Sequence, residues 1–298
     1  MTGMYWKTSF VLALVLILFG CNTSHKGDVL IEVEDYLDSP ADYILVDLQS
    51  EDAYLNGHIH DAVNINRAEF ENPNLPIKGM SMSKEDMESL LSSKGIQPNA
   101  KLILYDRKGG VEASRLWWIL KMYGFENAQI LNGGMDSWKG EITTEVPVIQ
   151  LTEFHFTGTG QPDMIIDYDQ LEKWRKAGSI ILLDNRSKDE FDGLVLKNGA
   201  SFAGHIPGAK NICYTNTFDF RPEHYMKIKP VKDLRTVYSA YANPEDTVVL
   251  YCHSGVRSAH TYMVMTELLG YKHVYNYDGS WIEWSFKSSA THSAFIIP

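Results

Sequence analysis

Short runs of uniformly apolar residues recur along the chain, and longer stretches with helical spacing alternate with them. The apolar runs predict strands at Tyr43–Asp47, Leu102–Tyr105, Ile180–Asp184 and Val248–Tyr251. The helical spacing predicts helices at Met82–Ser93, Glu112–Tyr123, Tyr168–Ala177 and Ser258–Leu269. Strands that are apolar on both faces are typical of a parallel sheet covered by helices on both sides. The alternation therefore predicts an α/β fold.

The same pattern occurs twice in the chain. The segment "GHIHDAVNIN" at 57–66 returns as "GHIPGAKNIC" at 204–213, and "LILYDRKGG" at 102–110 returns as "VVLYCHSGV" at 248–256. The second copy also has an insertion, Leu194–Ala203, just before its Gly-His-Ile. A repeat of this length indicates two domains of the same fold. We expect them at 27–145 and 166–287, joined by a polar linker at 146–165.

The two copies differ where reactive side chains would stand. The residues of the second copy and their counterparts in the first are Cys252 and Asp106, Arg186 and Gln49, and Arg257 and Val111. A first copy with the shape but without these groups is expected to do no chemistry. We expect it to pack against the site of the second copy. Truncation of Asp106 should then change stability only slightly.

The loop after the fourth predicted strand has the features of an anion-binding turn around a cysteine. Ligands of open parallel sheets bind beyond the carboxyl ends of the strands, where Cys252 lies. If the next helix begins near Ser258, backbone N–H groups of the loop face the thiol, and Gly255 permits the turn. The helix N-terminus, Arg257 and a partial charge on His253 should lower the thiol pKa. We predict a thiolate nucleophile, with an anion bound by His253, Ser254, Gly255, Val256, Arg257 and Ser258.

The spacing of this loop distinguishes two chemistries. Enzymes of the tyrosine-phosphatase type place cysteine and arginine as C-x5-R, which fits a phosphoryl group. Here Arg257 comes one residue earlier after Cys252, and a tighter loop suits one sulfur atom carried on the cysteine. A buried structural cysteine is the alternative. The glycine and the arginine close to this cysteine favour a reactive role.

These motifs resemble those of tandem-domain rhodaneses, the thiosulfate and 3-mercaptopyruvate sulfurtransferases. The resemblance runs from about Val29 to Lys287 and rests on "LNGGMDSW", "LLDNR", "GHIPGAKNI", "CHSGVRS" and "YDGSWIEW". It implies a five-stranded parallel sheet with helices on both faces in each domain, and an inactive first domain. It also implies a persulfide on Cys252 and a substrate-binding arginine at Arg186, with Asp184 in a structural role.

The resemblance further implies sulfur transfer without a cofactor. We expect a small anionic donor to bind Arg186 and Arg257, and a thiol or cyanide to remove the sulfur from Cys252. The charged loop favours thiosulfate, because the mercaptopyruvate branch usually has an uncharged loop, C-G-S/T-G-V-T. A 3-mercaptopyruvate sulfurtransferase and a lipid-anchored sulfur carrier or binding module remain as alternatives.

Five further side chains have competing interpretations. Cys213 is either a packed small side chain or a thiol that forms a disulfide with the reactive cysteine. His58 and His205 recur in both copies, which favours structural hydrogen bonds. Trp281 and Trp284 either line the pocket or pack in the core.

The first 20 residues are expected to be a bacterial lipoprotein signal peptide. Lys7 precedes an almost wholly apolar stretch, Thr8–Gly20, which is shorter than the roughly 20 residues that a spanning helix needs. Leu-Phe-Gly-Cys ends at Cys21, which would be lipidated and anchor the protein to a membrane of the cell envelope. An ordinary signal peptide is the alternative.

Composition excludes several other classes of function. The formal charge of −11 disfavours nucleic acid as a partner, since phosphate binding requires clustered Lys and Arg. No His and Cys cluster has the spacing of metal ligands, so we expect no metal site. The two cysteines that follow Cys21 are too few for a disulfide scaffold.

Overall fold

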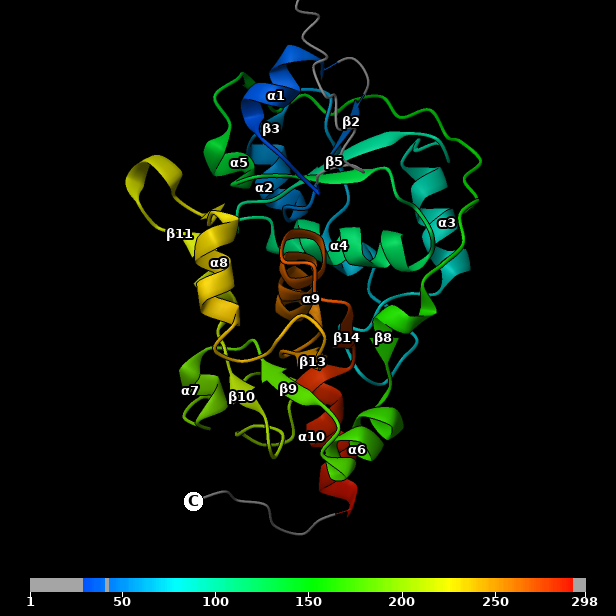
Figure 1. Cartoon of the computed structure of the whole chain (residues 1–298). Helices are drawn as coiled ribbons and strands as arrows, with labels where there is room; N and C mark the ends of the chain where they lie inside the picture. Colours follow the sequence, from blue (N-terminus) through cyan, green and yellow to red (C-terminus); the bar gives the residue numbers. More distant parts are fainter. Residues whose placement is uncertain (1–28, 41–42, 292–298) are drawn as a thin grey trace, which may run out of the picture.

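The computed structural model describes residues 29–40 and 43–291, which form two similar domains (Figure 1). The first sheet has the order β1-β6-β5-β2-β4 and the second the order β10-β9-β13-β14-β8. Neighbouring strands of both sheets are parallel. Because β2 and β5 correspond to β9 and β13 in the repeat, the two orders are the same. The predicted α/β fold with two five-stranded parallel sheets is confirmed.

The bounds of the strands agree closely with the apolar runs. The first sheet contains β1 (Leu30–Ile31), β2 (Tyr43–Asp47), β4 (Val63–Asn64), β5 (Lys101–Tyr105) and β6 (Ala128–Leu131). The second contains β8 (Ile165–Ile166), β9 (Ile181–Asp184), β10 (Lys210–Asn211), β13 (Thr247–Tyr251) and β14 (His273–Tyr277). Two small antiparallel pairs are β3 (His58–Ile59) with β7 (Ile142–Thr143) and β11 (Phe218–Asp219) with β12 (Lys227–Ile228).

The apolar runs are uniform because both faces of each sheet are buried. In β5, Leu102 and Leu104 belong to one hydrophobic cluster, while Ile103 and Tyr105 belong to another. Successive residues of a strand point to opposite faces, so a sheet covered on both sides needs apolar residues at every position. The second sheet repeats this division between two clusters.

The helices begin and end close to the predicted positions. They are α1 (Val33–Asp38), α2 (Glu51–Asn56), α3 (Lys84–Ser93), α4 (Val111–Met122), α5 (Gly134–Ser137), α6 (Tyr168–Ala177), α7 (Lys188–Phe191), α8 (Val231–Tyr238), α9 (Val256–Met263) and α10 (Ser280–Thr291). The prediction that a helix begins near Ser258 was two residues late. Gly255 has φ +81°, and this left-handed turn starts α9 at once. A π-helical segment, Val264–Leu268, continues α9 to the predicted end.

Helices α4 and α9 lie against each other between the two sheets and join the domains (Figure 1). One hydrophobic cluster includes residues of both helices, so the core is continuous across the interface. His260 of α9 is buried there, with Nδ1 3.1 Å from Ser114 Oγ and Nε2 2.9 Å from Thr217 Oγ1. Burial lowers the pKa of His260 to about 3, so the ring is neutral at ordinary pH. The interface holds the first domain firmly beside the loop of Cys252.

Residues 144–161 connect the domains without a helix or strand. They pack along α3, where the Phe154 amide donates to Ser92 Oγ at 3.0 Å and the Phe154 ring is buried. Among the residues that the structure describes, no helix is both long and apolar enough to cross a membrane. The predicted signal peptide and Cys21 lie outside the described residues.

Candidate active site

Cys252 is the first residue after β13 and is only 1% exposed. The loop that follows it is fixed by the N-terminus of α10. Ser280 Oγ accepts hydrogen bonds from the amides of Cys252 at 3.2 Å and Gly255 at 3.0 Å. The Trp281 amide donates to the Cys252 carbonyl oxygen at 3.1 Å. Of the loop amides expected to face the thiol, those of Ser254 and Ser258 bond to it, whereas the Gly255 amide binds Ser280.

The thiol of Cys252 has a pKa below that of an ordinary cysteine. Burial alone would raise this pKa, but the charge of Arg257 and hydrogen bonds from Ser258 and the Ser254 amide outweigh it. Ser258 Oγ lies 3.6 Å from Cys252 Sγ. These contacts favour the thiolate, the form that acts as a nucleophile.

Arg257 does not present an open positive charge to the pocket. Its guanidinium donates two hydrogen bonds to the Glu190 carboxylate, at 2.7 Å and 2.9 Å, and Lys197 Nζ lies 3.4 Å from the same carboxylate. Burial would raise the pKa of Glu190, but the hydrogen bonds and charge of Arg257 lower it to about 2. The expected full charge at Arg257 is therefore largely offset by Glu190.

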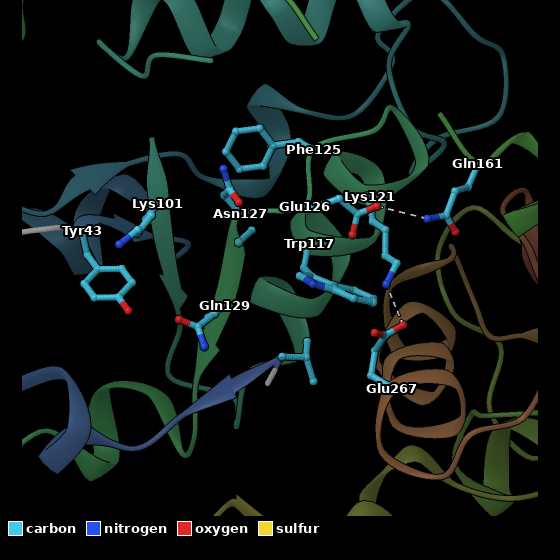
Figure 2. Close-up of a pocket in the computed structure, with 12 residues that line it drawn as sticks. Tyr43, Lys101, Trp117, Lys121, Phe125, Glu126, Asn127, Gln129, Gln161 and Glu267 are labelled. Carbon is cyan, nitrogen blue, oxygen red and sulfur yellow. Dashed lines mark hydrogen bonds and ion pairs between the residues drawn. The ribbon is translucent and has the colours of Figure 1, made fainter. Parts of the chain in front are cut away.

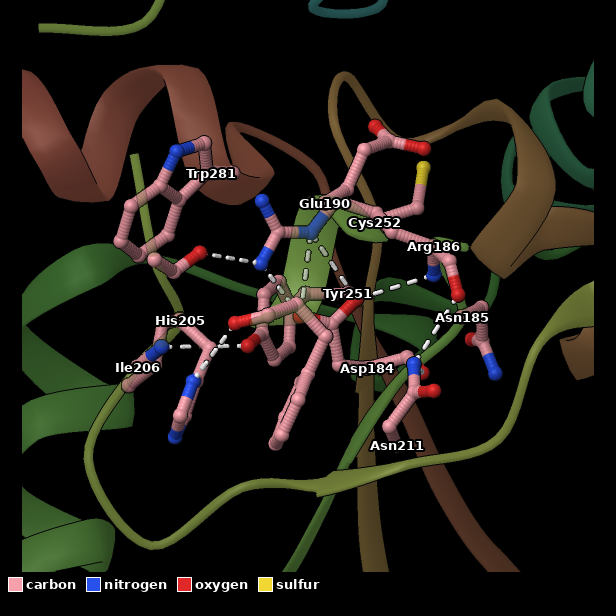
Figure 3. Close-up of polar contacts among 12 residues, drawn as sticks. Asp184, Asn185, Arg186, Glu190, His205, Ile206, Asn211, Tyr251, Cys252 and Trp281 are labelled. Carbon is pink, nitrogen blue, oxygen red and sulfur yellow. Dashed lines mark hydrogen bonds and ion pairs between the residues drawn. The ribbon is translucent and has the colours of Figure 1, made fainter. Parts of the chain in front are cut away.

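Arg186 is buried and bound to groups of its own domain, and its expected role in substrate binding stays a prediction. Its guanidinium donates to Asp184 Oδ2 at 2.5 Å and to the Gly204 carbonyl oxygen at 2.7 Å, as Figure 3 shows in part. It also lies 4.7 Å from the ring centre of Trp281. Arg186 is not among the residues that line the hollow at Cys252. Its contacts hold the end of β9, and Asp184 has the structural role expected for it.

His253 lines the pocket but is expected to be uncharged. Burial lowers its pKa. Nε2 lies 3.0 Å from the Asn198 carbonyl oxygen, so it carries the proton. Nδ1 is buried and has no hydrogen-bond partner among the described residues. Burial therefore weakens the partial positive charge expected at His253, because a poorly solvated ring is harder to protonate.

A hollow of about 380 Å³ opens onto the thiol. The second domain lines it with Lys197, Tyr214, Cys252, His253, Ser254, Val256 and Arg257. The first domain lines it with Arg67, Lys108, Val111 and Glu112. Of the predicted anion-binding residues, Gly255 and Ser258 are not among those that line the hollow. The expectation that the first copy closes the site of the second is met, and it also supplies cations.

The contribution of the first domain was only partly visible in the sequence. Arg67 Nη2 donates to Ser254 Oγ at 2.9 Å, across the domain interface. No local pattern identifies Arg67 or Lys108. The insertion before the second Gly-His-Ile was a usable signal, since it is present only in the reactive copy and carries Lys197 and Asn198. A second signal was that Glu190 and Arg257 are both replaced by small apolar residues in the first copy.

In the first domain, the loop that corresponds to the Cys252 loop is filled by the carboxylate of Asp106. Asp106 Oδ1 accepts from the amides of Lys108 at 2.6 Å and Gly110 at 2.9 Å. Asp106 Oδ2 accepts from the amides of Glu112 at 2.6 Å and Ala113 at 3.1 Å. An external anion therefore finds these amides occupied. These contacts favour a larger effect on stability than the sequence suggested, because removal of the Asp106 carboxylate leaves three buried N–H groups and the part-buried amide of Lys108 without their acceptor.

The other side chains with competing interpretations are now placed. His58 Nδ1 lies 2.8 Å from the Tyr54 carbonyl oxygen, and His205 Nδ1 lies 2.9 Å from that of Phe191, so both histidines are structural. Trp281 and Trp284 are buried in the core and stack at 5.3 Å. Cys213 and Cys252 are both free thiols, and Cys213 accepts a hydrogen bond from Thr215. Cys213 does not line the hollow at Cys252.

A larger hollow, of about 820 Å³, lies at the other end of the first sheet (Figure 2). Tyr43, Lys101 and Ala128 line it, and each stands at the amino end of a strand. Lys121 of α4 and Glu267 form an ion pair of 2.8 Å on its wall, between the two domains. It contains no cysteine, so it is not a candidate for the sulfur chemistry.

Comparison with known proteins agrees with this geometry. The rhodanese-like domain family matches residues 30–141 and 167–287. A thiosulfate sulfurtransferase of Pseudomonas aeruginosa is 33% identical over 81% of this chain and 87% of its own length. A sulfur carrier protein of Thermus thermophilus is 32% identical over 85% of this chain and 90% of its own. The structure of the 3-mercaptopyruvate sulfurtransferase from Leishmania major has the same fold, with a TM-score of 0.76 at 22% identity, covering 90% of this chain and 77% of that one. The chain therefore belongs to the rhodanese-like family and carries two copies of its domain.

Proposed function

We propose that this protein is a sulfurtransferase that moves the outer sulfur of thiosulfate to a nucleophilic acceptor through a persulfide on Cys252. The observation that carries the proposal is a buried thiol of lowered pKa at the base of a hollow lined by cations. Relatives named thiosulfate sulfurtransferase support the choice of donor.

The first half-reaction forms the persulfide. Thiosulfate enters the hollow, where Arg67, Lys108 and Lys197 attract its charge. The Cys252 thiolate attacks the outer sulfur, the sulfur–sulfur bond of thiosulfate breaks, and sulfite leaves with the electron pair. The electron pair of the thiolate forms the new sulfur–sulfur bond, and the outer sulfur keeps the negative charge that it carried in thiosulfate. The hydrogen bonds of Ser258 and the nearby amides then stabilise the sulfur anion.

The second half-reaction returns the thiolate. An acceptor such as cyanide attacks the outer sulfur of the persulfide, and the bond to Cys252 Sγ breaks. Cyanide becomes thiocyanate, and Cys252 leaves as the thiolate that starts the next cycle. This is covalent catalysis, in which the enzyme divides one transfer into two steps. Neither step requires a metal or an organic cofactor.

Mass spectrometry of the purified protein tests the mechanism. After incubation with thiosulfate, the peptide that contains Cys252 should carry one added sulfur, and cyanide should remove it. Cys252→Ser should lose transfer to cyanide and keep its fold, while Cys213→Ser is the matched control that keeps activity. An added sulfur on Cys213 instead of Cys252 would contradict the mechanism.

Two alternatives concern the donor and the acceptor. Kinetics with thiosulfate and with 3-mercaptopyruvate distinguish the two sulfurtransferases, since both use the same persulfide. The sulfur carrier protein among the relatives makes delivery to a partner protein a further candidate. Slow turnover with cyanide but fast transfer to a protein thiol would favour the carrier.

We also propose that the protein is a lipoprotein anchored at Cys21 in the bacterial cell envelope. The support is the sequence of the first 21 residues alone, with a short apolar stretch that ends in Leu-Phe-Gly-Cys. Cys21→Ser should move the protein from the detergent phase to the aqueous phase without changing its specific activity. A variant that stays in the membrane fraction would contradict the lipid anchor.

A further inference from the structure

Arg115 of the first domain contacts the loop of Cys252 from the side opposite to the hollow. The side chain belongs to α4 and is 2% exposed. Its Nη1 atom lies 2.5 Å from Asp278 Oδ1 and donates to the Gly255 carbonyl oxygen at 3.4 Å. Its Nη2 atom donates to the Gly79 carbonyl oxygen at 3.0 Å. A buried guanidinium of the first domain therefore touches the reactive loop of the second.

Asp278 holds this guanidinium in place and also joins the two domains. Its Oδ2 accepts hydrogen bonds from the amide and the Oγ of Ser81, both at 2.9 Å. Its Oδ1 accepts no hydrogen bond from the described residues, so the contact with Arg115 acts through charge. A Cβ atom on Gly255 would lie 2.9 Å from Arg115 Nη1 and 2.7 Å from Asp278 Oδ1. The loop therefore packs directly on this ion pair, and only glycine fits at the contact.

These contacts fix the direction of one peptide bond in the loop. The Gly255 carbonyl oxygen points toward Arg115 and also accepts from Asn276 Nδ2 at 3.4 Å. No peptide bond between described residues is cis, and in a trans peptide the carbonyl and the next N–H point in opposite directions. The next N–H is that of Val256, the first residue of α9, so it has no acceptor within the helix. Val256 lines the hollow and Arg115 does not, so this N–H is directed toward the hollow.

The first copy shows what this N–H meets in a loop of the same shape. In the repeat, Gly110 corresponds to Val256, and Asp106 corresponds to Cys252. The residue before this amide is a glycine with positive φ in both copies, +69° in the first and +81° in the second. The Gly110 amide donates to Asp106 Oδ1 at 2.9 Å. The equivalent amide of the second copy is therefore directed at a group carried on the side chain of Cys252.

The two copies need different means to keep this amide in place. A carboxylate oxygen is a strong acceptor, so Asp106 orients the amides of its own loop. Sulfur is a weak acceptor, and the thiol of Cys252 receives the amides of Ser254 and Ser258. Glycine at position 255 lets the following peptide turn over at little cost. A contact from behind the loop is then needed to hold the Val256 amide in its orientation.

We propose that Arg115 is a positioning residue for sulfur transfer. It holds the peptide between Gly255 and Val256 so that the N–H of Val256 faces the outer sulfur of the persulfide. The inference rests on the sulfurtransferase function proposed above. The outer sulfur extends one bond beyond Cys252 Sγ, so it lies closer to this N–H than the free thiolate does. The first domain thus stabilises the persulfide through the loop, without touching the substrate.

The equilibrium of the first half-reaction measures this contact. The thiolate and thiosulfate give the persulfide anion and sulfite, with the same total charge on both sides and no oxidant or reductant. Mass spectrometry of the intact protein at set ratios of thiosulfate to sulfite gives the fraction that carries the added sulfur. The double variant Arg115→Met/Asp278→Asn removes both charges of the pair at similar volume. It should lower the equilibrium constant about ten-fold, the loss expected for one hydrogen bond to a charged group.

Alkylation of the free thiol with iodoacetamide separates this role from a general loss of structure. The pKa of Cys252 is lowered by Arg257, Ser258 and the Ser254 amide, and the double variant keeps all three. The pH midpoint of alkylation should therefore move much less than the equilibrium constant. A midpoint that moves as far as the equilibrium constant would contradict the proposal, because the whole loop would then be disturbed.

A second variant and a matched control complete the test. Arg115→Lys leaves no buried charge unpaired, so it serves if the double variant does not fold. An ammonium lacks the planar fork that reaches Asp278 and the loop together, so the equilibrium constant should fall about three-fold. Lys121→Met is the control, because Lys121 of α4 forms another ion pair between the domains, 2.8 Å from Glu267, and does not line the hollow at Cys252. It should leave the equilibrium constant unchanged.

The outcomes separate the positioning role from the proposed function. An unchanged equilibrium constant in the folded variants of Arg115 would overturn the positioning role alone. An equal loss in Lys121→Met would overturn it too, since looser packing of the domains would then be the cause. Wild-type protein that takes up no sulfur from thiosulfate would contradict the proposed function, and the positioning role would fall with it.

Discussion

The Arg257 guanidinium and the Glu190 carboxylate form a pair of hydrogen bonds beside the reactive loop, at 2.7 Å and 2.9 Å. The Glu190 side chain is 4% exposed and that of Arg257 is 14% exposed. The first copy has Ala53 and Val111 at these positions, so the pair exists only where the thiol exists. Removal of one partner leaves the other charge buried, which is strongly destabilising.

Loss of the Arg257 charge should raise the pKa of Cys252. The thiolate reacts with iodoacetamide, and a lowered pKa keeps the thiol ionised at lower pH. In Arg257→Gln the midpoint of alkylation against pH should therefore move upward by about one unit, the usual effect of one nearby charge. Arg257→Lys keeps a charge and should move it less. An unchanged midpoint in folded Arg257→Gln would show that the loop hydrogen bonds alone set this pKa.

Glu190 should make stability depend on acid pH. Its folded pKa, about 2, lies below the unfolded value of 4.5, so its contribution is present above about pH 4.5 and is lost as pH falls toward 2. This shift in the pKa of Glu190 corresponds to a total contribution of about 3 kcal/mol to the free energy of unfolding. The free energy of unfolding in urea should fall between about pH 6 and pH 3, and Glu190→Gln should show a smaller slope. Equal slopes of unfolding free energy against pH in the wild type and in Glu190→Gln would exclude Glu190 as the source of the pH dependence.

Asp106→Ala should destabilise the first domain by about 3 kcal/mol, because it leaves buried amides without acceptors. Asp106→Asn keeps one carbonyl oxygen in the loop as an acceptor and should lose less stability than Asp106→Ala. Asp38→Ala, which removes an exposed carboxylate at the end of α1, is the control and should change stability little. Chemical denaturation gives the free energy of unfolding of all three variants. A loss in Asp106→Ala as small as in Asp38→Ala would mean that water replaces the carboxylate.

Lys197 should help to bind thiosulfate. It lines the hollow at Cys252, and its side chain is 46% exposed. Lys197→Gln should raise the KM for thiosulfate about three-fold, as expected for one partly exposed charge. Lys188→Gln, on the exposed side of α7, removes a lysine paired with Asp192 and should have no such effect. Because thiosulfate is a dianion, the wild-type protein should also use it more efficiently than 3-mercaptopyruvate, and the reverse order would favour the alternative function.

Several features of the protein follow from neighbouring residues alone. Apolar runs such as Val248–Tyr251 identify strands, because a strand buried on both faces requires an apolar side chain at every position. Comparison of the two halves of the chain identifies the repeat. It also predicts Cys252 as the reactive residue, because a cysteine, a glycine and an arginine stand together in one short loop. These conclusions need only the order of residues, since the strands and the loop depend on contacts within one short segment and the repeat is visible in the sequence itself.

The partners of the charged side chains were decided only by the tertiary structure. Arg186 binds Asp184 and stacks on Trp281, and Arg257 binds Glu190, so neither acts as the open cation that its position suggested. The first domain brings Arg67 and Lys108 to the hollow, and the insertion of the second brings Lys197, each of them beside a carboxylate. The electrostatic effect of a side chain depends on its burial and on the charge beside it. Both are set by packing between segments far apart in the chain, and no local pattern records that packing.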